Sequence, residues 1–582
     1  MSDEVDGPRP KQWILNAFSM STPGHLAPGL WSHPRNHASQ YKDIEYWVNL
    51  AKILEEGKFH GLFIADVLSH YGVYKGNGNI DPSLPGAAQF PMNDPFLAVS
   101  AMAAATKHLS FGVTASTTYE NPFLLARRFA TLDHFTKGRV AWNVVTSHLE
   151  PAARNLGLPT QIEHDERYRI AEEFVDLTYQ LWEGSWHDDA VVMDTETKQY
   201  TVPGRVRKIN HEGHYFQSAG PLTTEPSIQR TPFLFQAGAS RAGMAFATRH
   251  AECMFLPGMT PAAVRRTADE VRRLARESGR DPATIKLIAG MLVVVDETDA
   301  LAEAKYAEYR RQADLEGAMA LFGGWTGVDL DGWADDADFA FAGPGAIQSL
   351  IASWSATVPG TAGARWTKRR IAEELAVGGA HARAVGSPQT VADTLQAWVD
   401  KAGIDGFNLS YAVCPGDFED VVRWLLPELR ARGVFWADYA AATTRENYFQ
   451  DGRGPRLRSD HPGSRHKWPA EAKEEKNVVP RSELRSPEGY SLPATVMAKP
   501  GAFLLVPQKL DWSGLFVGSQ RRFAELDAAG WDALRKDDHK LHAVLLALGA
   551  RGDGGELRWL YDPGLAQEAE KRVRELQLSA DA

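Results

Sequence analysis

Side chains that can bind a ligand gather between residues 139 and 168 of this sequence. A short apolar run, VAWNVV, carries Asn143 and leads directly into Thr-Ser-His, which ends at His148. His164 and Tyr168 follow, spaced so that both lie on one face of the helix expected there. Barrel enzymes present amide, hydroxyl and imidazole groups at the ends of apolar strands in this way. The pattern therefore predicts one wall of a ligand site.

A glycine-rich turn, QAGASRAG at residues 236–243, is the best phosphate candidate. Glycine lets the backbone approach a ligand closely, and the helix that follows offers free N–H groups. Ser240 adds a hydroxyl to this set. The structural alternative is a tight strand-to-helix turn in which Ser240 caps the helix.

The other candidates also have structural interpretations. Asp66 ends the apolar run LFIA and could cap the next turn. His164 and Tyr168 could be a helix cap and a core tyrosine, while His25 and His148 could be hydrogen-bonded structural histidines. If all these residues lay close together, a ligand site would be favoured. Whether they do depends on the strands and helices that carry them.

Eight short runs rich in Val, Ile, Leu, Phe and Ala predict buried parallel strands. They cover residues 12–18, 61–67, 109–116, 139–146, 232–238, 252–256, 285–295 and 406–413. Helical patterns separate them, which predicts an α/β fold of the (β/α)8 TIM-barrel type. An open doubly wound sheet is the alternative, but it would usually carry a glycine-rich phosphate turn after an early strand, and this sequence has none.

The domain organisation follows from the same pattern. Residues 1–447 are expected to form the barrel, with insertions after strands 4 and 7 and a hairpin over 191–216 in the first of them. Residues 448–490 are polar and rich in Gly, Arg and Pro, as in a tail and linker. Residues 491–582 are expected to form a small C-terminal α+β extension of unknown role. Its elements would be a strand at 502–506 and helices at 519–529, 531–548 and 565–576.

The ends of barrel strands converge on one mouth, and the groups expected there define its chemistry. Asp66, Thr114, Asn143 and Ser240 would meet with several hydroxyls and imidazoles. The set lacks the paired carboxylates of glycoside hydrolysis and a histidine–carboxylate metal cluster. Largely neutral groups suit the binding of a large polar cofactor, together with an apolar or weakly polar substrate.

Composition excludes several other classes. The 63 Lys and Arg against 74 Asp and Glu give a net charge of −11, unlike the basic surface of a nucleic-acid binder. Cys253 and Cys414 lie in apolar runs and are interpreted as packing residues. No segment approaches the ~20 apolar residues that span a bilayer, and no secretion signal begins the chain. We therefore expect a cytoplasmic protein without a membrane span.

Several segments together resemble a known family. They are NAFSM, GHLAPGLWSHP, GKFHGLFIADV, MNDP, TKHLSFGVTASTTYENPF, ARRFATLDHFTKGRVAWNVVTSHL, EHDERY, LWEGSW, GPLTTEPSIQRTP, QAGAS, HAECMFL and AGIDGFNL. The chain resembles the bacterial luciferase-like flavin-dependent monooxygenases, in the branch of the nitrilotriacetate and dibenzothiophene-sulfone monooxygenases. It looks most like the long-chain alkane monooxygenases of that branch. The resemblance covers residues 12–466.

The resemblance implies a (β/α)8 barrel that binds FMN, as FMNH2, at the C-terminal ends of its strands. The implied FMN contacts are Asp66, Thr114, Asn143, His148, His164, Tyr168 and Ser240. Tyr168 and Ser240 would hold the phosphate end. The implied catalytic residues, beside the flavin ring or on its substrate side, are His25, Tyr71, Gln89 and His148.

The resemblance also implies a two-component reaction. A separate NAD(P)H:flavin reductase supplies FMNH2, O2 adds at C4a of the flavin, and the resulting (hydro)peroxide delivers one oxygen atom to a small-molecule substrate. We expect a homodimer or homotetramer. The alternatives are the same chemistry on a sulfone, sulfonate or aminopolycarboxylate, a non-catalytic flavin-fold binding subunit, and a deazaflavin-dependent oxidoreductase.

Overall fold

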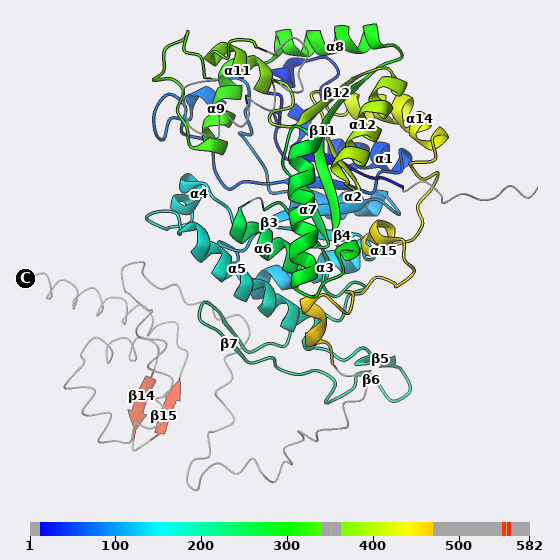
Figure 1. Ribbon diagram of the computed structural model, residues 1–582. Helices are drawn as coiled ribbons and strands as arrows, with labels where there is room; N and C mark the ends of the chain where they lie inside the picture. Colours follow the sequence, from blue (N-terminus) through cyan, green and yellow to red (C-terminus); the bar gives the residue numbers. More distant parts are fainter. Residues whose placement is uncertain are drawn as a thin grey trace, which may run out of the picture. The chain divides into compact units, whose positions relative to one another are not determined.

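Eight parallel strands of the computed structural model close into a barrel, which confirms the predicted fold (Figure 1). They are β1 (Ile14–Met20), β2 (Gly61–Ala65), β3 (Ser110–Ser116), β4 (Val140–Val145), β9 (Phe233–Gln236), β10 (Cys253–Leu256), β11 (Lys286–Val295) and β13 (Gly406–Ser410). Neighbours in this order pair, and β13 pairs with β1. The structure describes residues 12–238, 240–339, 351, 355, 363–468, 550–553 and 556–559.

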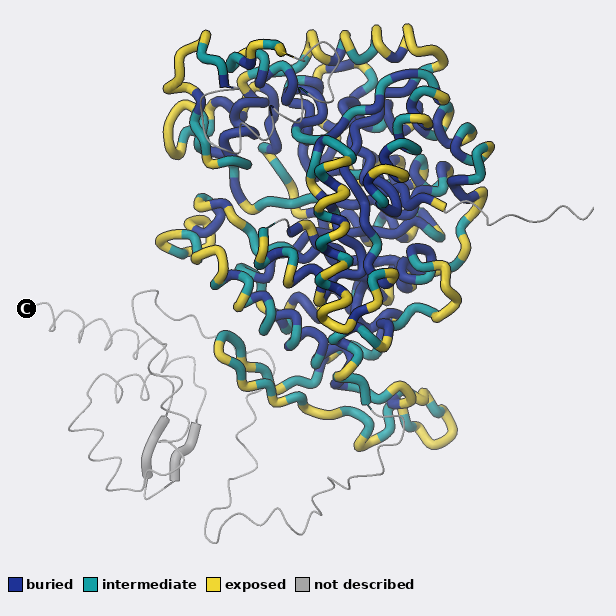
Figure 2. Tube along the Cα trace, in the orientation of Figure 1, coloured by how far each residue is buried: buried dark blue, intermediate teal, exposed yellow. Residues whose placement is uncertain are grey.

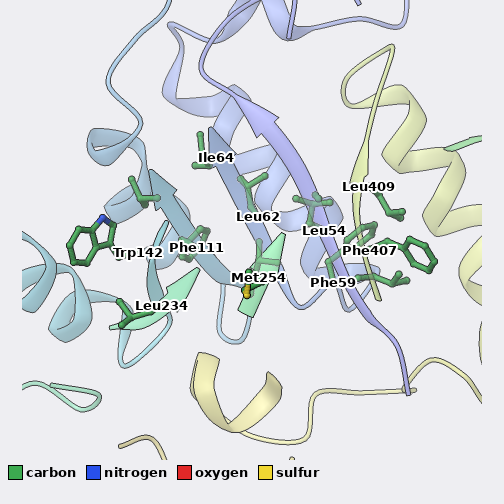
Figure 3. Packing of buried hydrophobic residues seen from close by; sticks show 14 of the residues in the cluster. Leu54, Phe59, Leu62, Ile64, Phe111, Trp142, Leu234, Met254, Phe407 and Leu409 are labelled. Atoms are coloured by element: carbon green, nitrogen blue, oxygen red, sulfur yellow. The ribbon is translucent and has the colours of Figure 1, made fainter. Parts of the chain in front are cut away.

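Alternation along each strand separates the barrel interior from the layer beneath the helices. In β4, Trp142 belongs to the large cluster between strands and helices, whereas Ala141 belongs to the cluster inside the barrel. Figure 3 shows the outer layer, with Leu62, Phe111 and Leu234 from three strands. Because side chains alternate along a strand, every second polar residue at a strand end points into the mouth of the barrel.

Helices that alternate with the strands surround the barrel (Figure 1). They include α1 (Ile44–Glu56), α2 (Phe96–Ala105), α3 (Pro122–Thr136), α6 (Arg241–His250), α7 (Pro261–Glu277) and α12 (Pro388–Ala402). Asn121, Thr260 and Ser387 begin α3, α7 and α12 by accepting hydrogen bonds from backbone N–H groups, and each is followed by proline. Figure 2 shows the exposed outer sides of α7 and α8 (Asp299–Gln312) over buried strands.

Both predicted insertions are present. The one after β4 contains α4 (Glu150–Asn155), α5 (His164–Tyr179) and two antiparallel pairs where one hairpin was expected. These pairs are β5 (Val191–Asp194) with β6 (Gln199–Thr201), and β7 (His211–Glu212) with β8 (Gln217–Ser218). The insertion after β11 contains α8, α9 (Leu315–Thr326), α11 (Lys368–Leu375) and β12 (Ala382–Gly386).

Strand β12 is absent from the predicted set. It pairs with the second half of β11, from Met291 to Val295, outside the closed barrel. Arg383 interrupts its short apolar run, so the sequence pattern there is weak. The pairing places the residue just before β12, His381, beside the mouth.

A buried ion pair lies at the opposite end of the strands. Arg445, from α15 (Thr444–Phe449), donates to both carboxylate oxygens of Glu252 at 2.6 and 2.7 Å. The two side chains are 0 and 2% exposed. Arg445 also donates to the carbonyls of Thr231 and Pro232, just before β9. The pair thus ties the segment after β13 to the start of two barrel strands.

The chain divides into two compact units, residues 1–479 and 480–582. In the second unit the structure describes one antiparallel pair, β14 (Ala550–Asp553) with β15 (Glu556–Trp559). The strand expected at 502–506 and the helices expected at 519–529, 531–548 and 565–576 lie outside the described residues.

The described ranges contain neither a membrane-spanning helix nor a group of side chains that could bind a metal ion. None of the helices there is long and apolar enough to cross a membrane. None of the groups of His, Cys, Asp and Glu side chains there could hold a metal ion. Cys253 and Cys414 are buried free thiols, in keeping with a packing role.

Candidate active site

Thr114 and Asn143 are paired across β3 and β4, on the interior face of the barrel. The Nδ2 of Asn143 donates to Oγ1 of Thr114 at 2.9 Å, and Thr114 donates to the carbonyl of Ile64 at 2.8 Å. The Oδ1 of Asn143 has no partner in the described structure, although this side chain is buried. A buried acceptor without a partner carries a desolvation cost that a ligand donor would relieve.

Ser240, Gly243 and Tyr168 form a small cradle at the start of α6. The Oγ of Ser240 accepts a hydrogen bond from the N–H of Gly243 at 3.0 Å. The first N–H groups of a helix have no intrahelical acceptor and attract anions. A Cβ on Gly243 would lie 2.6 Å from the Tyr168 hydroxyl and 3.0 Å from Oγ of Ser240. The glycine therefore keeps open the space where the two hydroxyls meet.

His164 lies beside this cradle. Its ring is 5.2 Å from the ring of Tyr168, in an edge-on arrangement, as the spacing along α5 predicts. Its Nδ1 forms a 2.7 Å hydrogen bond with Asp165, and the side chain is 45% exposed. The imidazole is thus accessible to a ligand held at the start of α6.

A cavity of about 340 Å³ opens beside β2, β3 and β4. Asp66 and Thr114 line it, together with Ser69, whose buried hydroxyl has no partner in the described structure. Burial, and then the nearby carboxylate of Asp94, raises the pKa of Asp66 to about 7. At neutral pH this carboxyl group can therefore either donate or accept a hydrogen bond.

A second cavity, of about 510 Å³, contains His25, Tyr71 and Gln89. The Tyr71 hydroxyl donates to Oε1 of Gln89 at 2.8 Å, and Nε2 of Gln89 donates to the carbonyl of His25 at 2.8 Å. The indole N–H of Trp325, from α9, donates to the Tyr71 hydroxyl at 3.3 Å. The side chains of Tyr71 and Gln89 are therefore fixed by hydrogen bonds to each other and to the backbone of His25.

The rest of this larger cavity is mostly apolar. Its remaining lining residues include Phe18, Met20, Leu26, Ala65, Val67, Phe255, Leu256, Pro257, Met259 and Trp325. None of the described residues that line it carries a carboxylate, an ammonium or a guanidinium group. Burial, and then the neighbouring His381, lowers the pKa of His25 to about 3, so this imidazole is neutral at pH 7. The cavity therefore suits an uncharged molecule.

His148 is the last of the predicted residues, and it lies in the loop after β4. It lines neither cavity, and the residue is exposed. Burial of the imidazole ring, and then Arg167, lowers its pKa, while a hydrogen bond with the carbonyl of Gly324 opposes this shift. His148 therefore lies between the two insertions, beside Gly324, the residue whose Cβ would meet the ring of Tyr71.

Three site residues were missed by the sequence analysis. Trp325 and His381 line the larger cavity. Arg167 is 7% exposed and donates to the carbonyl of Ile162, while its Nε has no partner in the described ranges. Arg167 directly precedes Tyr168, so the EHDERY segment was a usable signal for it. Trp325 and His381 come from the second insertion, whose path over the mouth no local pattern predicts.

The sequence of this chain matches that of a known protein family. The sequence profile of a family described as luciferase-like monooxygenase matches residues 20–406, from the end of β1 to the start of β13. The chain belongs to this family. The luciferase-like monooxygenases depend on flavin, and the predicted family, fold and enzyme class are all confirmed.

Individual relatives match nearly their whole length. Dimethyl-sulfide monooxygenase of Hyphomicrobium sulfonivorans is 44% identical over 78% of this chain and 94% of its own. Its crystal structure superposes with a TM-score of 0.75, covering 78% of this chain and 96% of that one. Long-chain alkane monooxygenase of Geobacillus thermodenitrificans is 44% identical over 78% of this chain and 98% of its own.

A third relative has a flavin in its structure. Riboflavin lyase was crystallised with modified FMN and riboflavin; it is 34% identical, covers 79% of this chain and 100% of its own, and has a TM-score of 0.71. These three proteins act on different compounds, so family membership alone leaves the substrate of this chain open.

Proposed function

We propose that the protein is the oxygenase of a two-component system, which uses FMNH2 and O2 to insert one oxygen atom into a small neutral substrate. The observation that carries this proposal is the pair of cavities at the mouth. One is lined by Asp66, Thr114 and hydroxyl groups, the other is mostly apolar, and Val67 lines both. A polar cofactor and a weakly polar substrate would therefore be neighbours.

The residues present fit FMN. The cradle of Ser240, Gly243 and Tyr168 offers hydroxyl and N–H groups to a phosphate, and His164 would complete it. Asn143, with its unpartnered acceptor, would face the flavin, as would Asp66 and Thr114, and His148 would lie at its edge. When bound as FMNH2, the flavin supplies the electrons that activate O2.

The protein would contribute position and exclusion of water. Burial raises the pKa of Tyr71 to about 12, so its hydroxyl stays protonated and can keep donating to Gln89. Neutral His25 can form a hydrogen bond without placing a charge in the apolar cavity. His25, Tyr71 and Gln89 would in this way hold the substrate side of the site in a fixed geometry.

The larger cavity favours a neutral substrate over the alternatives. A sulfonate or an aminopolycarboxylate would need a cationic partner, and none of the described lining residues provides one. A sulfone is uncharged and stays within the proposal. For the protein as a whole we propose a separate NAD(P)H:flavin reductase as partner, assembly as a homodimer or homotetramer, and a cytoplasmic location.

The test is oxygen incorporation under ¹⁸O2. The full chain, FMN, NADH and a flavin reductase would be mixed with a panel of thioethers, alkanes, ketones and sulfones, and the products analysed by mass spectrometry. With catalase present to remove hydrogen peroxide, we expect labelled product from at least one neutral compound and no labelled organic product from the same mixture without the protein. Tight FMNH2 binding without labelled product across the panel would favour a non-catalytic flavin-binding subunit.

A further inference from the structure

His381 reaches the mouth over a glycine of β11. A Cβ on Gly290 would lie 2.6 Å from both Cδ2 and Nε2 of the His381 ring, so the imidazole lies directly on the bare backbone. Gly290 occupies an interior position of β11, between the outward-facing Ala289 and Met291. Both Gly290 and His381 line the larger cavity, and His25 lines it as well. Any larger residue at 290 would displace the ring from this position.

Three neighbours hold the ring in one orientation. The ring of Phe18 stacks on it at 5.5 Å with an interplanar angle of 27°, and Phe255 meets it edge-on at 5.7 Å. Its Nδ1 forms a 2.9 Å hydrogen bond with Oγ of Ser410, at the end of β13. The side chain of a solvent-exposed histidine usually lacks three such contacts. The arrangement is that of a positioned group at a ligand cavity.

The hydrogen bond with Ser410 also determines what Nε2 can do. Within the described ranges the Ser410 hydroxyl has no other hydrogen-bond acceptor, so donation to Nδ1 of His381 satisfies it. We assign this tautomer to His381, with the ring proton on Nε2, for which no hydrogen-bond partner is found among the described residues. Burial lowers the pKa of His381 to about 4, so the ring is neutral at pH 7. His381 thus offers an N–H donor to a mostly apolar cavity, in addition to the neutral imidazole of His25, whose Nδ1 has no partner in the described structure.

We propose that His381 is a specificity-determining residue, whose Nε2–H donates a hydrogen bond to the acceptor atom of a neutral substrate. The substrate class is then an uncharged molecule with one oxygen acceptor, such as a ketone, an ether or a sulfoxide, and not a pure hydrocarbon. This deepens the proposed function and rests on it for the identity of the cavity as the substrate site. The ring of Phe18 contacts both imidazoles, with its centroid 5.5 Å from that of His381 and 4.6 Å from that of His25.

The test compares two probes of the same shape. Cyclohexanone has a carbonyl acceptor, whereas methylenecyclohexane replaces its oxygen with a CH2 group. Dissociation constants for both would be measured by ligand-observed NMR on the full chain, first without flavin and then with FMN. In His381→Phe, which keeps an aromatic ring on Gly290, we expect cyclohexanone to bind about 10-fold more weakly and methylenecyclohexane to bind as before.

Two further variants keep the test decisive. Ser410→Ala leaves the imidazole but releases its tautomer, so it should weaken cyclohexanone binding by a smaller factor; His25→Phe should leave more than half of the ketone preference. The proposal would be overturned if His381→Phe weakened the binding of both probes equally, or if the preference for the ketone depended on His25 alone. Because the first measurement uses no flavin, a failure to bind FMN would count against the proposed function and not against this role of His381.

Discussion

Gly243→Ala should lower the affinity of the protein for FMN about 100-fold. The new Cβ would lie 2.6 Å from the Tyr168 hydroxyl and 3.0 Å from Oγ of Ser240, within the space assigned to the phosphate. Hydrogen bonds to a charged group contribute about 1.5–3 kcal/mol each, and losing two of them accounts for a change of this size. Anaerobic titration of FMNH2, followed by flavin fluorescence or calorimetry, measures it.

Riboflavin is the matched control ligand, because it lacks the phosphate. Its affinity should change little in Gly243→Ala, so the ratio of FMN to riboflavin affinity should collapse. Ser240→Ala and Tyr168→Phe each remove one hydroxyl and should lower that ratio about 10-fold. Gly332→Ala is the control variant, since a Cβ there would meet no atom within 4 Å. An unchanged ratio in all three cradle variants would refute this placement of the phosphate.

Arg445→Met should lower the free energy of unfolding by about 3–5 kcal/mol, the usual cost of leaving one partner of a buried ion pair alone. Glu252 would keep a negative charge at 2% exposure, with the N–H of Leu234 as its remaining donor in the described structure. Urea unfolding followed by tryptophan fluorescence measures the loss. FMN affinity at low urea should not change, because the pair lies at the opposite end of the strands from the mouth.

Two comparisons separate charge burial from loss of packing. Adding Glu252→Gln to Arg445→Met removes the unpaired charge and should recover at least half of the lost stability. Arg273→Met breaks an exposed pair with Glu270 and Glu277, which solvent screens, and should change the free energy of unfolding far less than Arg445→Met does. Equal losses in the exposed and the buried variants would contradict the importance given to this pair.

Much of the site could be predicted from sequence because it depends on local geometry. The period of two along a strand places Thr114 and Asn143 inside the barrel once their strands are identified. Four-residue spacing on a helix brings His164 to Tyr168. In the same way, a glycine-rich turn that leads into a helix predicts the cradle around Ser240.

The rest depends on contacts between distant segments. His381 reaches the mouth only because β12 pairs with the second half of β11, and the short run that Arg383 interrupts does not predict that strand. Trp325 meets Tyr71 through the path of an insertion, which has no periodicity to reveal it.

The most direct test of the central claim is a crystal structure of the full chain with FMN. We expect the phosphate within hydrogen-bonding distance of Ser240 and Tyr168, and the flavin ring between Asn143 and the cavity that contains His25 and His381. The second cavity should stay open on one face of the ring to admit a substrate. Electron density for FMN elsewhere would contradict the account. So would an FMN whose ring fills the apolar cavity and whose phosphate lies away from α6.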